Sequence, residues 1–231
     1  MKQTSTTTGP ASTIGRSVRA ERAESTRGLI LATAARLFAE HGVYPVSNRQ
    51  ISEAAGQGNN TAVGYHFGTK TDLVRAIVHE HDGRMERIRR QLVDGRDGRD
   101  ELRDWVTCLV RPLTDHLAAL GSPTWYARCA AQFMTDPALR QVITDDAMDA
   151  PALRQCADGL ARCLPHLPEP VRATRMDMVR DLIVHTCADQ ERALADHPSP
   201  PEPAWSATAT ALIDAIAGLL RAPATPVNPP S

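Results

Sequence analysis

Runs of apolar residues spaced three and four apart recur along most of this chain, and glycines or prolines separate them. The first run contains Ile30, Ala34, Leu37 and Phe38, which fall on one face of an α-helix that ends at Gly42. No stretch alternates apolar and polar residues for long enough to predict a β-sheet. The sequence therefore predicts an all-α fold, with a small N-terminal three-helix bundle and a larger C-terminal helical bundle.

Two short helices separated by a tight turn are predicted next. Ser47 to Gln50 and Thr69 to Asp72 both have the pattern of a capping box, in which a hydroxyl and a later polar side chain satisfy each other's backbone amides. Gly56 ends the first short helix, and Gly68 ends a second helix of roughly residues 60–67. Two helices joined in this way, with an earlier helix packed behind them, predict a helix-turn-helix.

In a helix-turn-helix, the second helix enters the major groove with its N-terminal end first. Short polar side chains are needed there to read the edges of the bases, and a helix start also favours a phosphate. The candidates for base and phosphate contacts are Asn59, Asn60, Thr61, Tyr65 and Lys70. A solvated polar loop is the alternative interpretation of residues 57–61.

Charge divides the chain of 231 residues unevenly. Residues 1–93 carry 13 Lys and Arg against 8 Asp and Glu, a net charge of +5, whereas residues 94–231 carry 13 against 19, a net charge of −6. This asymmetry favours a nucleic-acid partner for the N-terminal part, although a difference of this size also occurs by chance. The five cysteines form no C-x-x-C pair, and no secretory signal or run of 18 apolar residues is present. We therefore expect a cytoplasmic protein with no disulfide framework and no membrane partner.

The stretch from Thr26 to Ile77 resembles the N-terminal domain of TetR-family transcriptional repressors. The resembling segments are residues 30–42, 49–56 and 65–73, and the last, with its Phe-x-Thr-Lys-x-x-Leu close, is the most specific. The turn before Phe67 is one residue longer than is usual in the family. Gly64 therefore stands where the family commonly has a tyrosine that touches the DNA backbone, and Tyr65 and His66 are the candidates for that role.

The resemblance implies sequence-specific binding to double-stranded DNA and no enzymatic activity. It also implies phosphate contacts from Thr26 or Arg27, Ser47, Arg49 and Lys70. The expected organisation is a disordered basic arm (1–24), a helix-turn-helix DNA-binding domain (25–72), a connecting helix (73–93), a ligand-binding and dimerisation domain (94–222) and a disordered tail (223–231). The arm contains Arg16, Arg19 and Arg22, which either enter a minor groove or remain solvated.

Family members bind a small ligand inside the C-terminal domain, and this chain has aromatic, histidine and cysteine side chains at helical spacing there. The expected pocket residues are Trp105, Leu109, His116, Trp125, Tyr126, Cys129 and Phe133. Such a stripe is also typical of an ordinary helical core. Under the resemblance, it is expected to hold a small organic effector, without any cofactor or metal.

Family members also dimerise through their last two helices. The apolar faces expected to meet a second copy contain Met176, Val179, Ile183, Leu212, Ile213, Ile216 and Leu220. A C2 dimer places its two recognition helices about 34–36 Å apart, one turn of DNA. The resemblance therefore implies a homodimeric repressor that leaves a pseudo-palindromic operator when the effector shifts the connecting helix.

Three alternatives remain at this point. A DNA-binding activator or a ligand-independent regulator would have the same motifs. An enzyme would need a pair such as Cys187 and His185, or Cys129 and His116, but the first pair points to different sides of a helix and no catalytic motif is present. A metal sensor would have to rely on a pair such as His185 and Asp189, which are at i, i+4 on a predicted helix and are also typical of an ordinary surface pair.

Overall fold

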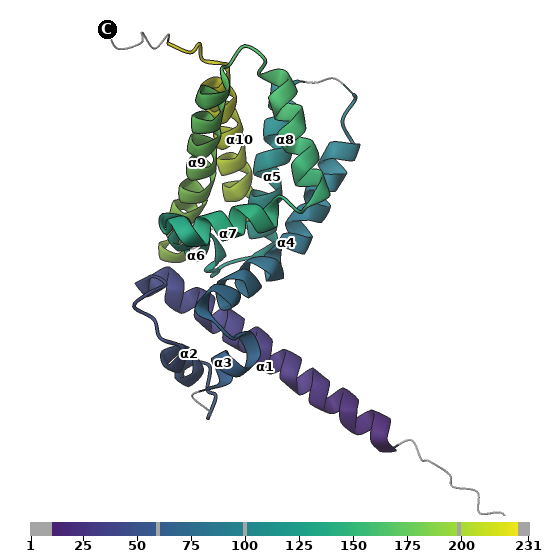
Figure 1. Ribbon diagram of the computed structural model, residues 1–231, viewed down its shortest axis with the longest axis vertical. Helices are drawn as coiled ribbons and strands as arrows, with labels where there is room; N and C mark the ends of the chain where they lie inside the picture. The colour runs from purple at the N-terminus through teal and green to yellow at the C-terminus, as the bar shows by residue number, and fades with distance from the viewer. Residues whose placement is uncertain (1–10, 59–60, 99–100, 198–199, 226–231) are drawn as a thin grey trace, which may run out of the picture.

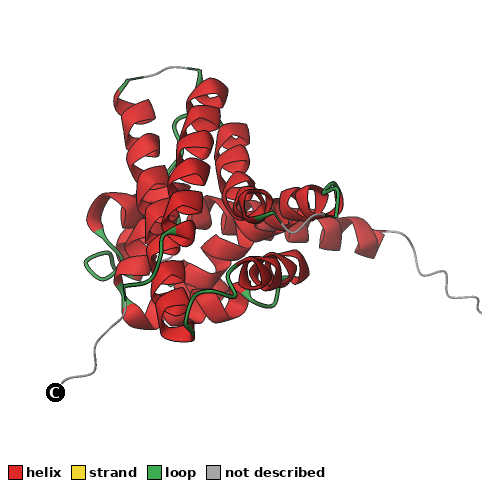
Figure 2. Cartoon of the chain, turned by 90° about the horizontal axis from the view of Figure 1, so that it is seen from above, coloured by secondary structure: helices red, strands yellow, loops and turns green. Residues whose placement is uncertain are grey.

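The computed structural model describes residues 11–58, 61–98, 101–197 and 200–225. Over these residues it contains helices and loops and no strand (Figures 1 and 2), which confirms the all-α prediction. The helices are α1 (Ala11–His41), α2 (Asn48–Ala54), α3 (Ala62–Phe67), α4 (Lys70–Asp94), α5 (Leu102–Leu120), α6 (Tyr126–Thr135), α7 (Pro137–Ala147), α8 (Pro151–Cys163), α9 (Glu169–Asp196) and α10 (Pro201–Arg221).

The N-terminal domain forms as its local signals predict. The Ser47 hydroxyl accepts a hydrogen bond from the Gln50 amide, and the Gln50 side chain accepts one from the Ser47 amide at 2.8 Å. Gly42 follows α1 with a φ of +83°, a conformation that residues with a Cβ rarely adopt. Phe38 and Ile51 are fully buried in the small core that α1, α2 and α3 share. The helix-turn-helix thus rests on a packed support.

Helix α1 is longer than expected. It begins at Ala11, so residues 11–24 are helical and the predicted disorder of the whole 1–24 arm is wrong for that part. Ala, Arg and Glu dominate residues 19–24, and these are strong helix formers. Residues 21–25 are exposed, and the helix extends well away from the rest of the molecule (Figure 1).

The C-terminal domain is built around α5 and α10, which pack along each other and against α4, α8 and α9. Its largest buried side chains include Trp105, Leu117 and Trp205. The apolar spacing of residues 136–164 predicts a single helix there, but the structure divides this segment into α7 and α8. Ala150 lies in the extended region immediately before Pro151, because a proline disfavours helical geometry in the residue before it.

Helix α10 is long and apolar enough to cross a bilayer by length and composition alone. In the structure it is a core helix, with Ile216 and Leu220 fully buried against its neighbours. Burial of this face against α5 and α9 accounts for part of its apolar composition, since 39% of the apolar stretch lies inside the molecule.

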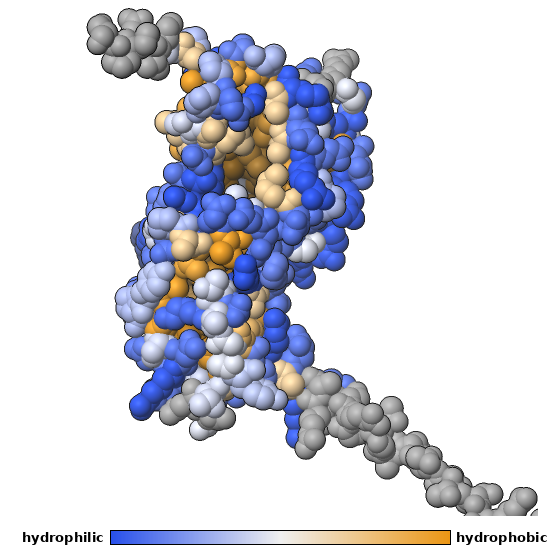
Figure 3. Space-filling model, in the orientation of Figure 1, coloured by the Kyte–Doolittle hydropathy of each residue, from blue (hydrophilic) through white to orange (hydrophobic). Residues whose placement is uncertain are grey.

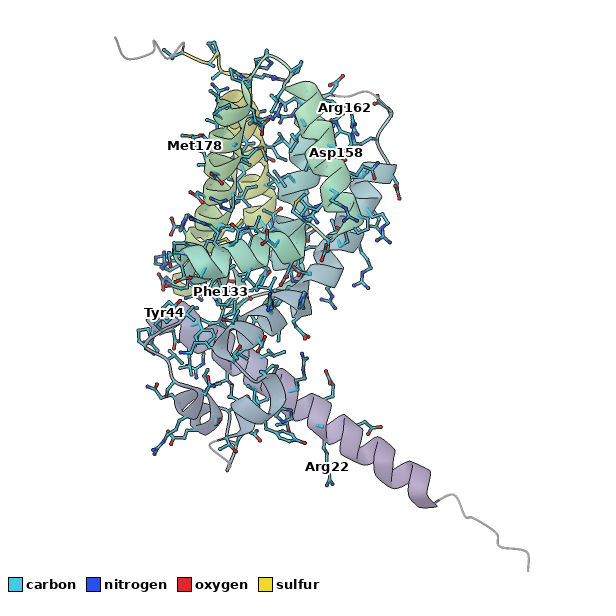
Figure 4. All side chains as sticks on the ribbon, viewed as in Figure 1. Arg22, Tyr44, Phe133, Asp158, Arg162 and Met178 are labelled. Atoms are coloured by element: carbon cyan, nitrogen blue, oxygen red, sulfur yellow. The ribbon has the colours of Figure 1, made fainter. Side chains whose placement is uncertain are left out.

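Helix α4 runs from one domain into the other, and side chains join the domains beside it. The Phe38 and Phe133 rings meet edge to face at 6.2 Å between centroids. Tyr44 donates a hydrogen bond to Asp136 at 2.7 Å, and Arg75 donates one to Asp146 at 2.9 Å. Figure 4 shows Tyr44 and Phe133 at the junction, below the α6–α7 corner. Residues at the corner between α6 and α7 therefore contact both α1, through Phe38, and the loop after α1, through Tyr44.

Candidate nucleic-acid interface and its junction with the C-terminal domain

Helix α3 presents a polar, solvent-facing surface. Thr61 is its exposed N-cap residue, and Tyr65, one turn later, has 84% of its surface exposed. On the opposite side, Ala62, Val63 and Phe67 are buried and attach the helix to the domain. Exposure of one large aromatic side chain without any covering side chain leaves it available to a partner.

Tyr65 and His66 were the two candidates for the tyrosine that the family has at the position of Gly64. The His66 ring is half-buried and contacts the rings of Tyr65 and Phe67, whereas Tyr65 points outward. The geometry therefore favours Tyr65. Asn59 and Asn60 lie outside the described residues.

The residues expected at the DNA backbone lie on neighbouring helices. Ser47 is exposed at the start of α2, and its hydroxyl is used in the cap. Arg49 is exposed on α2 and forms an ion pair with Glu53 at 2.7 Å. Thr26 and Arg27 are half-buried on α1, and the Arg27 guanidinium lies 5.2 Å from the centre of the Phe67 ring. These residues lie on α1 and at the start of α2, and α2 packs on both α1 and α3.

Lys70 makes internal contacts that the sequence did not predict. Its ammonium donates hydrogen bonds to the backbone carbonyls of Val46 at 2.5 Å and Val43 at 3.0 Å. Burial lowers the pKa of Lys70. The start of α4 lies beside the loop before α2, so two of the three ammonium donors of Lys70 are used inside the protein, and the expected phosphate contact stays a prediction. Lys70 fixes that loop and so the position of α2.

The seven expected pocket residues do not line one cavity. The Trp105 ring on α5 packs against Gly159 of α8, and the Arg96 guanidinium lies 3.3 Å from its centre. Leu109 is half-buried on α5. Phe133 packs on Phe38, and Cys129 is fully buried on the same face of α6. Helical spacing placed these side chains correctly on inward faces, but those faces meet different neighbours. The structure thus gives the seven residues different neighbours, and the expected ligand pocket stays a prediction.

His116 belongs to a buried cluster at the domain junction. Its Nε2 lies 2.8 Å from Nδ1 of His81, and the Tyr126 ring stacks on His81 at 3.8 Å between centroids. Burial lowers the pKa of both histidines to about 4, and the charge of Arg84 contributes. Both rings are therefore neutral at neutral pH, and one ring donates a hydrogen bond to the other.

A cleft of about 280 Å³ opens beside this cluster, between α1, α4 and the connection from α5 to α6. Two of the expected pocket residues, Trp125 and Tyr126, line it. Glu80 and His81 also line it, and sequence reasoning missed both for this role. Their spacing on α4 carried no signal, since the facing wall comes from α1, far away in the sequence.

Glu191 is another functional side chain that the sequence did not reveal. It is 2% exposed on α9, and it accepts hydrogen bonds from the backbone amides of Ala127 and Arg128 and from the Arg128 guanidinium. A carboxylate at the start of a helix satisfies amides that have no partner within the helix. Glu191 therefore attaches the first turn of α6 to α9.

The predicted dimer residues are mostly interior. Val179, Ile183, Leu212, Ile213, Ile216 and Leu220 are buried within the chain, and Met176 is half-buried. Helices α9 and α10 use these faces against α5 and α6. Periodicity does not say which apolar edge of a helix faces inward. Exposed apolar side chains lie instead on another edge of α9, at Met178 and Leu182. Half-buried Leu219 of α10 lines the same shallow grooves.

No group of three or more His, Cys, Asp or Glu side chains that could hold a metal occurs among the described residues. His185 and Asp189, the proposed metal pair, are exposed side chains in a shallow groove on α9. Of the five free cysteines, four are buried, and burial raises the pKa of all four thiols: Cys108, Cys129, Cys156 and Cys187.

Comparison with known proteins identifies both domains. Residues 30–77 match the family model described as bacterial regulatory proteins, tetR family, and residues 107–218 match the model described as tetracyclin repressor-like, C-terminal domain. The HTH-type transcriptional repressor AcnR of Corynebacterium glutamicum is 35% identical over 68 residues, which are 29% of this chain and 36% of that protein. The matched segment thus spans about a third of that relative's length.

A solved TetR-family transcriptional regulator from Pectobacterium atrosepticum aligns with 88% of this chain and 98% of its own, with 20% identity and a TM-score of 0.33. The two family models together match the greater part of the chain, and they confirm the resemblance in the sequence. The family consists of regulators and not of enzymes, so the enzyme alternative is set aside. The chain belongs to the TetR family of DNA-binding transcriptional regulators.

Proposed function

We propose that the protein is a homodimeric repressor that binds a pseudo-palindromic operator in the cytoplasm and is released by a small organic effector. The exposed face of α3, with Thr61 at its start and Tyr65 one turn along, is the observation on which this rests most. Threonine and tyrosine hydroxyls can bond to base edges or phosphates, and the threonine methyl can pack on a thymine. The name of the relative AcnR, a transcriptional repressor, supports repression as the direction.

A second copy of the chain is proposed to cover the exposed apolar edge of α9 and α10. Figure 3 shows apolar surface along the C-terminal helices, and Met178, Leu182 and Leu219 lie on the outer faces of α9 and α10. Exposed apolar side chains that line one groove are typical of an interaction site. A C2 axis along this edge would pair the two DNA-binding domains for two half-sites about 34–36 Å apart.

Selection of bound duplexes from a random DNA pool is the direct test of the proposal. We expect an enriched sequence with two inverted half-sites, and binding by a dimer. Recovery of no common sequence, or of a single unpaired half-site bound by a monomer, would contradict it.

Variants of the exposed arginines then test the orientation of the domain on DNA. Arg49→Gln should weaken binding to all sequences and lower the slope of log K against log salt by about 1, as the loss of one phosphate contact does. Arg192→Gln is the matched control, because Arg192 is an exposed arginine on α9 that also pairs with a carboxylate of its own helix. Equal salt slopes for the two variants would exclude α2 from the DNA backbone.

A further inference from the structure

The cleft at the domain junction has the composition of a binding site. Apolar side chains form its walls on two sides, among them Leu31 and Ala32 of α1 and Ile77 of α4. The half-buried Trp125 adds an indole ring to the wall, and the Arg128 guanidinium lies 4.3 Å from the centre of that ring. Its volume of about 280 Å³ lies near the lower end of the range for small-molecule sites. The walls suit a small apolar or aromatic body.

The charge of the cleft is negative. Glu80 is the only acidic residue among the described residues that line it, and no lysine or arginine lines it. No ion pair or hydrogen bond engages the Glu80 side chain within the described part of the chain. The nearby Arg128 is neutralised by the buried Glu191 at 3.1 Å. A ligand in the cleft would therefore meet one exposed carboxylate, and Arg84, whose charge acts on His81, does not line the cleft.

His81 places a second polar group beside Glu80. Its Nδ1 is used by His116 at 2.8 Å, which leaves Nε2 as the ring atom without a hydrogen bond among the described residues. When Nδ1 donates to His116, Nε2 carries a lone pair and accepts a hydrogen bond. The depressed pKa, about 4, keeps this ring uncharged at neutral pH, so it does not repel a cation. Glu80 thus offers an acceptor next to an apolar wall, and His81 offers a second one in the tautomer whose Nδ1 donates to His116.

We propose that this cleft binds a small organic amine, with its ammonium on Glu80 and His81 and its apolar or aromatic body against α1 and Trp125. The proposal deepens the proposed function, on which its regulatory part rests, by naming the chemical class and the place of the effector. Helix α1 connects the two roles, since one part of it, residues 28–35, lines the cleft and another, Arg27, lies on the α3 ring Phe67. An amine between α1 and the α5–α6 connection is expected to shift the supports of α3.

The test uses the full chain and three probes of similar size: 2-phenylethylamine, the neutral 2-phenylethanol and the anionic 3-phenylpropionate. In calorimetric titrations we expect the amine to bind at least tenfold more tightly than the alcohol, and the acid not to bind. Binding of the alcohol or the acid as tightly as the amine, or binding of none of the three at millimolar concentration, would overturn the proposal.

Two variants locate the site. Glu80→Gln should remove the preference for the amine over the alcohol, and Ala32→Phe should fill the cleft and prevent binding of both. Glu101→Gln is the matched control, because Glu101 is an exposed residue outside the cleft whose side chain makes no capping bond. A preference that survives in Glu80→Gln, or is lost equally in Glu101→Gln, would contradict the assignment.

The regulatory part is tested by reciprocity. If the amine lowers the affinity for the selected operator by some factor, the operator must lower the affinity for the amine by the same factor. Unchanged operator affinity in saturating amine would overturn the link between the cleft and DNA. DNA binding by the protein without amine tests the proposed function alone, so the two failures are distinguishable.

Discussion

The α2–α3 unit and the α5–α10 bundle are both helical, but different kinds of contact hold them. Local features fix the α2–α3 unit. The Ser47 capping box begins α2, and Gly56 and Gly68, both at positive φ, follow α2 and α3 within a few residues. Distant partners fix the bundle, as Glu191 reaches α6 from more than 60 positions away. Local devices suit a surface that must stay exposed for DNA, since they need no covering layer. Long-range burial suits a domain that must transmit a change from one helix to another.

The largest expected effect breaks a long-range contact. Glu191→Ala leaves two backbone amides and the Arg128 guanidinium without their acceptor in a buried place. Removal of one partner of a buried ion pair costs about 3–5 kcal/mol. Denaturant unfolding should therefore show a fall of this size in the free energy of unfolding.

Asp189→Asn is the control for Glu191→Ala, because Asp189 lies nearby on α9 in an exposed pair with Arg192. Its unfolding free energy should stay within about 0.5 kcal/mol of the parent. Equal losses in the two variants would mean that the connection between α6 and α9 does not depend on the buried carboxylate.

A second variant overfills the bundle. A Cβ at Gly159 would lie 2.1 Å from the Trp105 ring, so Gly159→Ala forces α8 and the indole apart. Overpacking of this kind costs about 1–3 kcal/mol. The melting temperature should fall, and the near-ultraviolet signal of tryptophan should change with it.

Gly218→Ala on α10 separates crowding from helix propensity. A Cβ at Gly218 would meet no atom within 4 Å, and alanine is favoured over glycine in a helix by up to about 1 kcal/mol. This variant should be as stable as the parent or more so. Destabilisation of both glycine variants would show that backbone flexibility matters there and not the indole contact.

Acid should weaken the junction between the two regions. The pKa of His81 and of His116 is lowered to about 4 in the folded chain, against 6.5 for a free histidine, so the unfolded chain binds more protons between these values. Stability is therefore fully present above pH 6.5 and falls as the pH falls from 6.5 toward 4. Unfolding free energies measured at pH 7 and pH 5 should differ accordingly.

His116→Gln should flatten this dependence, since it removes one of the two groups with a depressed pKa. His166→Gln provides the comparison, because His166 is exposed after α8 and lies outside the cluster. A pH dependence that stays unchanged in His116→Gln would contradict the assignment.

A smaller effect is expected where local signals dominate. Ser47→Ala removes the side-chain acceptor for the Gln50 amide at the start of α2. Loss of such a cap costs about 0.5–2 kcal/mol. Hydrogen exchange should show that the increase in exposure is confined to α2 and α3, whereas Glu191→Ala should affect α6 and α9. Spread of the Ser47→Ala effect through the bundle would remove the contrast between the regions.

The smallest effect on stability is expected at the exposed hydrogen bond that joins the regions. Tyr44→Phe removes the bond to Asp136 but keeps the ring, and Tyr44 is 67% exposed. The melting temperature should hardly change, while the effect of a bound amine on operator affinity should decrease. Tyr65→Phe is the matched control and should instead weaken DNA binding with or without amine.

The contrast between local and long-range contacts also explains what the sequence could predict. The helix-turn-helix followed from short-range patterns such as Ser47-x-x-Gln50 and the glycine after Phe67, and the structure confirms these ends. The break before Pro151 was missed, although the restriction that a proline places on Ala150 was readable. Lys70 could not have been assigned, because its partners are carbonyls of Val43 and Val46, which no side-chain pattern encodes.

The burial of the expected pocket and dimer residues has a related explanation. Periodicity shows that a helix has an apolar face, but it does not say which other helix covers that face. Other helices of the same chain cover the faces that contain Val179 and Ile216, whereas Met178 lies on an exposed edge of α9. Glu80 and His81 become a candidate site only when residues 28–35 fold across from them.

Helix α1 has 31 residues, so it is about 45 Å long at 1.5 Å per residue. It is held near its middle and its C-terminal end, where it lines the cleft and packs on α6, while its first turns extend beyond the domain (Figure 1). A straight rod held in this way acts as a lever. Any tilt that starts at the domain junction moves its N-terminal tip much farther than the point where the tilt begins.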